Sequence, residues 1–387
     1  MVDTSARDLI QPTGAKRIDL CSQLWRGPSV QEVLDQNGGS FPGFDTFRVG
    51  LSLSVVLVHS CILSYGIAGS QALLEPPLLS FMLSILPLFF ALSGFLVAGS
   101  ALRLRNTGAF LLFRGLRIVP ALLVEVIIST LILGPLLTSL PLREYFSDPD
   151  FFSYFANITG RFRFALPGMF EGLPIDRIVN GNLWTLRPEF HCYLLMSLLM
   201  LSRVAYSRVM ITILWSVASI AIAFYNQATG ELAPGGYFGP TLLVYSFATG
   251  VVAFHWRDRI RLNIILAVIS GTCAYVLLRV PQNALFSIPA LTYLMVWIGA
   301  QRLPRISGDY SYGVYLFSYP IQQTLVGTFP SLREWWLLFP AAATIALLIA
   351  ALSWHFVEMP ALRLKKPVLS VSYFWKARFV RHILGSR

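Results

Sequence analysis

Ten apolar segments, each long enough or nearly long enough to cross a bilayer, occupy most of the chain from residue 46 onward. They lie at about 46–66, 79–100, 118–138, 183–202, 209–225, 238–255, 263–279, 284–300, 310–328 and 336–356. Only 13% of the 387 residues are charged, whereas a soluble domain carries about 25%. The sequence therefore predicts an all-α, polytopic membrane bundle with about ten transmembrane helices in one membrane domain.

The basic residues are distributed unevenly between the two sides of these segments. If the N-terminus lies inside, 23 of the 30 Lys and Arg residues fall on the inner side, and 7 fall in the outer loops. Because basic loops are retained on the cytoplasmic side, this asymmetry predicts that both termini are cytoplasmic. The net charge of +11 then belongs to the inner face of a membrane protein and does not require nucleic acid.

The apolar segments divide the chain into three parts. Residues 1–45 are predicted to form a cytoplasmic N-terminal arm, in which 20–36 suits one short amphipathic helix. Residues 46–362 form the transmembrane domain, and residues 363–387 form a basic cytoplasmic tail. The one sizeable outside loop, 139–182, contains several aromatic residues and is predicted to be an extramembrane lid or platform.

Polar residues inside apolar segments mark candidate sites, because a polar group at membrane depth is costly. Arg48 and His59 are eleven residues apart, so they share one helix face and are separated by roughly 16 Å of rise. With the N-terminus inside, His59 lies past the midplane, in the outer half of the membrane. The imidazole is either a functional group or a histidine hydrogen-bonded to a neighbouring helix.

The segment 181–190 enters the membrane from outside and carries a second buried charge. Glu189 lies about one to two turns deep, close to the predicted depth of His59. A carboxylate at that depth is able to hold the imidazole tautomer or to raise its basicity. The alternative is that Glu189 pairs with an arginine, such as Arg187 or Arg48, which makes its burial tolerable.

Two further charged positions lie on the predicted inner side. Arg114 and Arg117 are three residues apart and share one face of a helical turn. They either bind phosphate through bidentate contacts or act only as positive-inside anchors. Glu358, at the end of the last apolar segment, is predicted to form a helix cap or an ion pair.

No metal-binding pattern is visible in the sequence. The chain contains no GxGxxG, no P-loop and no HExxH motif. Four histidines make no metal-ligand spacing with Cys or carboxylate residues: His191, His255, His355 and His382. The sequence therefore predicts neither a bound metal nor a bound cofactor.

Five motifs occur in a fixed order across residues 44–363. They are Phe44-Asp45 through Arg48 to His59, Leu88 to Leu96 with its Phe-Phe-Ala-Leu-Ser-Gly-Phe core, Arg114 to Pro120, Leu183 to Tyr193, and Phe356 to Pro360. Together they resemble the integral membrane acyltransferase type 3 family, which O-acylates sugars of bacterial surface and secreted glycans. Thr46 replaces the usual Gly of the first motif, Ser318 stands where the family often has a histidine, and His355 stands where Arg is common.

The resemblance implies an O-acyltransferase of the bacterial cytoplasmic membrane. It implies acyl-CoA, usually acetyl-CoA, as the co-substrate and a carbohydrate hydroxyl, possibly on a lipid carrier, as the acceptor. We expect the CoA head to bind near Arg48, Arg114 and Arg117 at the inner face. The acyl group would extend toward His59, which acts either as general base or as a covalent acyl relay.

The remaining motif residues are expected to assist these groups. Glu189 would orient or polarise His59, while Trp184 and Tyr193 would stack on or hydrogen-bond the acceptor. Supporting positions implied by the motifs are Asp45, Ser93 and Glu358.

A transporter or exporter of a small solute or saccharide is the rival class, since buried charges and broken spans also mark solute pathways. No inverted internal repeat, which transporters often show, is visible in the sequence. A third class, a scaffold protein in a glycan-assembly complex, would leave the Arg48/His59 pair and the Arg114/Arg117 pair without a function.

The predicted orientation is testable by cysteine labelling in intact cells. A membrane-impermeant thiol reagent should label single cysteines placed in 139–182, and it should not label those in 103–117 or after residue 363. Labelling of 103–117 from outside would overturn the orientation.

Overall fold

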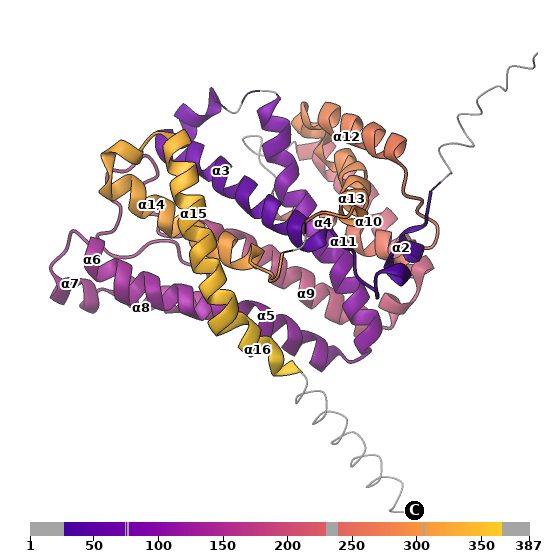
Figure 1. Ribbon diagram of the computed structural model, residues 1–387, viewed down its shortest axis with the longest axis horizontal. Coiled ribbons are helices and arrows are strands. Elements are labelled where there is room, and N and C mark those ends of the chain that lie inside the picture. Colours follow the sequence, from indigo (N-terminus) through magenta and orange to yellow (C-terminus); the bar gives the residue numbers. More distant parts are fainter. Residues whose placement is uncertain (1–26, 74, 76, 230–238, 305, 366–387) are drawn as a thin grey trace, which may run out of the picture.

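The computed structural model describes residues 27–73, 75, 77–229, 239–304 and 306–365. Within these ranges the chain is a bundle of helices without strands, and one isolated backbone bridge joins Ser29 to Arg261. The predicted all-α class is confirmed (Figure 1).

The helices follow one another in a simple order along the chain. They are α2 (Val30–Gln36), α3 (Phe44–Gln71), α4 (Leu78–Leu104), α5 (Thr107–Ile128), α6 (Gly134–Leu137), α7 (Leu142–Ser147), α8 (Pro149–Tyr154), α9 (Leu186–Leu201), α10 (Arg208–Thr229), α11 (Pro240–His255), α12 (Ile264–Leu278), α13 (Ala284–Ala300), α14 (Ser311–Thr328), α15 (Trp335–Ser353) and α16 (Met359–Arg363). Two π-helical turns, η1 (Ser129–Leu133) and η8 (Trp354–Glu358), join α5 to α6 and α15 to α16. The 3-10 helix η3 (Gly181–Thr185) leads into α9.

Each of the ten apolar segments coincides with a helix, so the helical assignment is confirmed. Five described helical stretches are long and apolar enough to cross a membrane: Phe44–Gln71, Leu78–Leu104, Thr107–Leu137, Arg208–Thr229 and Trp335–Arg363. Helices α11, α12 and α13 are apolar but shorter. The number of about ten spans, and the side on which each terminus lies, remain predictions.

Large apolar side chains cover the outside of the bundle. On α10, Val217, Ile220 and Phe224 are exposed, at 59%, 58% and 70% of their surfaces. A soluble monomer rarely exposes a continuous apolar surface of this kind. The exposed helix faces therefore suit the hydrocarbon of a membrane, and the chain is a multi-pass membrane protein.

The described part of the N-terminal arm is fastened to the bundle. Ser29 caps α2 by accepting a hydrogen bond from the Glu32 N–H at 3.1 Å, and the Glu32 carboxylate accepts one from the Ser29 N–H at 2.7 Å. The Val30 N–H donates a hydrogen bond of 3.0 Å to the carbonyl of Ile260, a residue that follows the end of α11. The first part of the predicted helix 20–36, and the tail beyond residue 365, lie outside the described residues.

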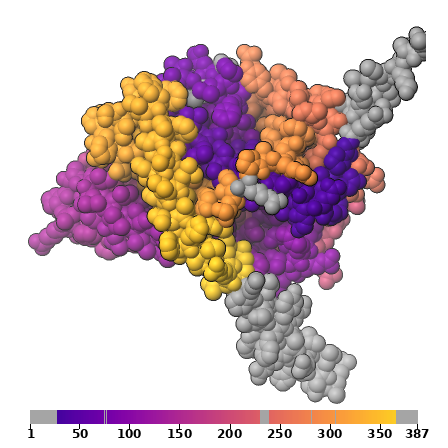
Figure 2. Space-filling model, viewed as in Figure 1, coloured from indigo at the N-terminus to yellow at the C-terminus, as the bar shows by residue number. Residues whose placement is uncertain are grey.

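The segment 139–182, predicted to be a lid or platform, forms a lobe at one end of the molecule (magenta in Figures 1 and 2). Tyr145 and Tyr154 are completely buried in it, and the rings of Tyr145 and Phe151 pack edge to face with centroids 5.4 Å apart. The Tyr145 hydroxyl donates to the Thr130 carbonyl of η1 at 2.8 Å. The lobe is therefore packed firmly against the end of α5.

Helices α4 and α11 cross at two glycines. A Cβ atom on Gly94 would overlap the Phe247 carbonyl oxygen of α11, and one on Gly250 would overlap the Ala91 carbonyl oxygen of α4. Small residues at a crossing let two backbones approach closely, which favours helix association inside a membrane. The Gly94 position of the second sequence motif is thus required by packing.

Gly94→Ala should destabilise the protein by about 1–3 kcal/mol, because the added methyl group forces α4 away from α11. Gly50→Ala on α3 is the matched control, since an added Cβ there meets nothing within 4 Å. The measurement is the thermal unfolding midpoint of each purified variant in the same detergent. Equal midpoints for the two variants would contradict the close crossing.

Candidate functional site

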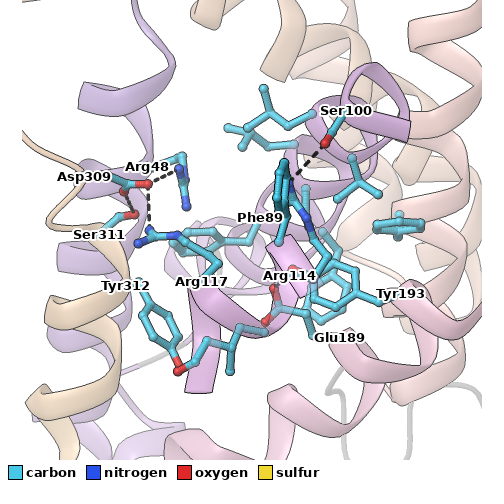
Figure 3. A pocket seen from close by; sticks show the side chains of 18 of the residues that line it. Arg48, Phe89, Ser100, Arg114, Arg117, Glu189, Tyr193, Asp309, Ser311 and Tyr312 are labelled. Carbon is cyan, nitrogen blue, oxygen red and sulfur yellow. Dashed lines mark hydrogen bonds and ion pairs between the residues drawn. The ribbon is translucent and has the colours of Figure 1, made fainter. Parts of the chain in front are cut away.

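A cavity of about 730 Å³ lies between α4, α5, α9, α14 and the C-terminal segment (Figure 3). Its volume falls within the range of about 300–1,000 Å³ that is typical of small-molecule and cofactor sites. The lining residues of α4 run from Leu86 to Leu104, which corresponds to about 27 Å of helix rise. The cavity is therefore long enough to hold an extended ligand parallel to the helices.

The two ends of the cavity differ in chemistry. Toward Leu86 the wall is apolar and aromatic, with Phe89 and Tyr315 packed edge to face at 6.2 Å between ring centroids. Toward Leu104 the lining is basic. The five cations that line the cavity are Arg48, Arg103, Arg114, Arg117 and Lys365.

Asp309 forms ion pairs with two of these cations, and the three residues come from different parts of the chain. The Asp309 Oδ2 atom accepts from Arg48 Nη1 and from Arg117 Nη2, each at 2.6 Å, and Ser311 Oγ donates to Oδ1 at 2.7 Å. Burial alone would raise the pKa of Asp309, but the charges of Arg48 and Arg117 outweigh it and lower the pKa to about 2. The carboxylate is therefore ionised and holds α3, α5 and the start of α14 together.

Arg117 also binds the carboxylate at the end of α15. Arg117 Nη1 lies 2.6 Å from Glu358 Oε2, and Ser353 Oγ donates to Glu358 Oε1 at 3.0 Å. The π-helical turn η8 changes the register of the helix, so that Glu358 is 1% exposed while Phe356, two residues earlier, is 76% exposed. Of the helix cap and the ion pair predicted as alternatives for Glu358, the structure shows the ion pair.

Glu189 projects into the same cavity from the first turn of α9. Its carboxylate accepts a hydrogen bond from the Tyr193 hydroxyl one turn later. The Arg114 guanidinium lies 5.9 Å from the centre of the Tyr193 ring. Glu189, Tyr193 and Arg114 thus form a polar group that lines the cavity (Figure 3).

His59 lies deeper along α3 and is not among the residues that line the cavity. Its ring packs edge to face against Tyr319, with centroids 5.2 Å apart. Its Nδ1 atom is buried and makes no hydrogen bond to any described residue. Since Tyr315 lines the cavity and Tyr319 is one turn further along α14, His59 lies about one helical turn beyond the aromatic end of the cavity.

The backbone between the lobe and α9 is fixed by buried amides. Asn180 donates to Glu125 Oε1 at 2.8 Å and to the Leu316 carbonyl at 3.0 Å, while Asn182 binds the Tyr315 carbonyl. Glu125 is 1% exposed, and its Oε2 atom makes no hydrogen bond to any described residue. This seam holds η3 against α14 beside the aromatic end of the cavity.

The structure brings six of the predicted site residues to one cavity: Arg48, Ser93, Arg114, Arg117, Glu189 and Tyr193. Four others do not line it: Asp45, His59, Trp184 and Glu358. The expected neighbours His59 and Glu189 each contact a different tyrosine, so orientation of His59 by Glu189 remains a prediction. In the described part of the chain, no group of three His, Cys, Asp or Glu side chains is placed to hold a metal ion.

Sequence reasoning missed Asp309, Arg103 and Lys365. Asp309 was detectable, because it is an acidic residue at the start of a predicted span, on the same predicted side as Arg48 and Arg117. Arg103 and Lys365 were counted only as positive-inside residues, and no local pattern shows that they face the same cavity.

Comparison with known proteins identifies a family and two curated relatives. The family described as Acyltransferase domain matches residues 41–355. An O-acetyl transferase of Shigella phage Sf6 is 27% identical over 368 residues, covering 85% of this chain and 98% of the relative. Nodulation protein 10 of Rhizobium leguminosarum bv. viciae is 28% identical over 311 residues, covering 73% of this chain and 83% of the relative. No solved structure gives a significant match.

Arg117→Ala should cost about 3–5 kcal/mol of stability, because Asp309 and Glu358 would keep buried charge without their shared partner. Arg177→Ala is the matched control. Arg177 Nη2 lies 3.5 Å from Glu171 Oε1, and the Arg177 side chain is 67% exposed. Such an exposed ion pair contributes at most about 1 kcal/mol to stability. Unfolding of the purified variants measures both effects, and similar losses would refute the structural role of Arg117.

Proposed function

Because this chain belongs to the family of the acyltransferase domain and is an acyltransferase, we propose that it is an O-acetyltransferase of the bacterial cytoplasmic membrane. The proposed donor is cytoplasmic acetyl-CoA. The proposed acceptor is a hydroxyl group of a surface or secreted glycan, such as an exopolysaccharide, an O-antigen or a glycolipid. The relative named O-acetyl transferase, matched over nearly its whole length, supports the acetyl group and the oxygen acceptor.

The observation that carries this proposal is the polarity of the cavity. An acyl-CoA has an anionic nucleotide head, a long neutral arm and a thioester at the far end. The cavity extends along about 27 Å of α4, with cations at one end and an aromatic end about one helical turn from His59. We place the head among the cations and the thioester at the aromatic end, near Tyr315 and Tyr319.

His59 is the proposed general base. In the direct mechanism, its unprotonated ring nitrogen accepts the proton of the acceptor hydroxyl as the hydroxyl oxygen attacks the thioester carbonyl. The C–O bond forms, the C–S bond breaks, and the proton passes to the departing thiolate to give CoA. In the relay alternative, the imidazole carries the acetyl group between donor and acceptor. Tyr319 packs against the ring and supports either role.

Glu189 and Tyr193 are proposed to bind substrate inside the cavity. Their hydrogen bond fixes both side chains on one face of α9. Tyr193 lines the cavity beside Arg114 and is a proposed substrate contact. Trp184 lies in the adjoining η3 turn and is the proposed acceptor contact. Asp45 and Ser93 stay supporting positions, and Ser93 lines the cavity wall.

His59→Ala should abolish acetyl transfer while leaving an inserted and folded protein, because the buried Nδ1 atom of the ring makes no hydrogen bond to a described residue that its removal would break. The assay follows release of CoA thiol from acetyl-CoA by purified protein with a glycan acceptor. It is paired with mass spectrometry of cell-surface glycans and glycolipids. His355→Ala is the matched control, since that imidazole is exposed and bonds the Ala351 carbonyl one turn earlier on α15.

Near-normal acetylation by folded His59→Ala would refute the general-base and relay roles together. A wild-type protein that consumes no acetyl-CoA and adds no acetyl group to cell glycans would refute the proposed function. Solute uptake or export in its place would assign the chain to a transporter.

A further inference from the structure

The cations at the basic end of the cavity form two groups that differ in how their charge is balanced. Arg48 and Arg117 share Asp309, and Arg117 also holds Glu358, so two guanidinium groups face two carboxylates. Arg103, Arg114 and Lys365 form no ion pair with any described residue. Glu189 lines the same cavity, but its observed bond is with Tyr193.

The three unpaired cations line one cavity, although they come from distant parts of the chain. Arg103 lies in the last turn of α4, Arg114 in the second turn of α5, and Lys365 just after α16. The buried Nε atom of Arg114 makes no hydrogen bond to a described residue, and its Nη2 atom has only a 3.4 Å contact with Ser100 Oγ. Lys365 Nζ lies 5.4 Å from the centre of the Phe113 ring. Several donors of this group therefore remain available to a ligand.

Lys365 is held in a position that disfavours its own charge. Burial, and then the charges of Arg114 and Arg117, lower the pKa of Lys365 to about 8. The acidic residue nearest to it in sequence, Glu358, is already bonded to Arg117 and Ser353. Clustered cations are stabilised when an anion binds between them, and a phosphate group accepts charge-assisted hydrogen bonds from both Arg and Lys.

We propose that Arg103, Arg114 and Lys365 form the phosphate-binding site of this cavity, and that Arg48 and Arg117 are structural. The proposal deepens the donor assignment and rests on the proposed function: the ligand is the phosphorylated nucleotide head of the acyl-CoA. Lys365 and Arg103 are thereby assigned as ligand-binding residues, and the group that they bind is an organic phosphate.

The site couples ligand binding to pH. A bound phosphate stabilises the ammonium form and raises the pKa of Lys365, so binding takes up a proton when the free lysine is neutral. Donor affinity should therefore fall as the pH rises from 7 through 9. The charged groups that act on Lys365 are Arg114 and Arg117, both on α5. Lys365→Arg should bind donor with an affinity that stays flat over the same range.

The test is titration of full-length protein in phosphatidylcholine nanodiscs with CoA, with dephospho-CoA and with pantetheine. Arg103→Ala, Arg114→Ala and Lys365→Ala should each weaken CoA binding about tenfold, because each removes a charge-assisted contact, and should leave pantetheine binding unchanged. Arg363→Ala is the matched control, because Arg363 is exposed on α16 and does not line the cavity. It should bind CoA within about twofold of the wild type.

Equal CoA affinity of Lys365→Ala and Arg363→Ala would overturn the site. So would equal affinity of the wild type for CoA and pantetheine. Stabilisation by phosphatidylglycerol nanodiscs without any binding of CoA would assign the cations to a lipid headgroup instead. The readouts distinguish this inference from the proposed function. Acetyl transfer by Lys365→Ala with an unchanged KM for the donor would refute only the phosphate site. The predicted pattern of CoA binding without acetyl transfer would refute only the proposed function.

Discussion

The carboxylate of Asp309 is the contact on which the arrangement of the site depends. It binds two guanidinium groups at 2.6 Å, one from α3 and one from α5, at the point where α14 begins. Through Arg117 the same network reaches Glu358, which the π-helical turn η8 points into the bundle. Three separate stretches of the chain that carry sequence motifs therefore meet at one buried ionic group. Removal of any one member would leave uncompensated buried charge on the others.

This network also determines which cations at the basic end of the cavity lack a carboxylate partner. Two of the five lining cations are neutralised by their carboxylate partners, which leaves Arg103, Arg114 and Lys365 to attract an anion. The opposite end is formed where η3 and α14 are joined by buried amides, with Tyr315 and Tyr319 in successive turns. The fold thus presents a ligand with a cationic end, an apolar wall and an imidazole beyond it, in that order.

The sequence predicted the helices well because continuous apolar runs determine them directly, and all ten predicted segments are helical. It predicted a helix cap or an ion pair for Glu358 without its partner, and it missed Asp309, whose partner Arg117 is 192 residues away. Counting residues along a span gives the depth of a side chain but not its direction around the bundle. For this reason His59 and Glu189, predicted at similar depths, turn out to contact different tyrosines. Lys365 belonged to a tail predicted only from its charge, so its place at the cavity required the three-dimensional structure.

The most direct test of this account is to determine the direction in which the donor lies in the cavity. An acyl-CoA with a photoreactive group on its acyl chain, and a second with the group on the adenine, are cross-linked to the purified protein and mapped by peptide mass spectrometry. We expect the acyl label to fall near Phe89 and Tyr315, and the adenine label to fall near Arg103 and Lys365. The reverse distribution, or labels confined to the exposed faces of α10 and α12, would contradict it.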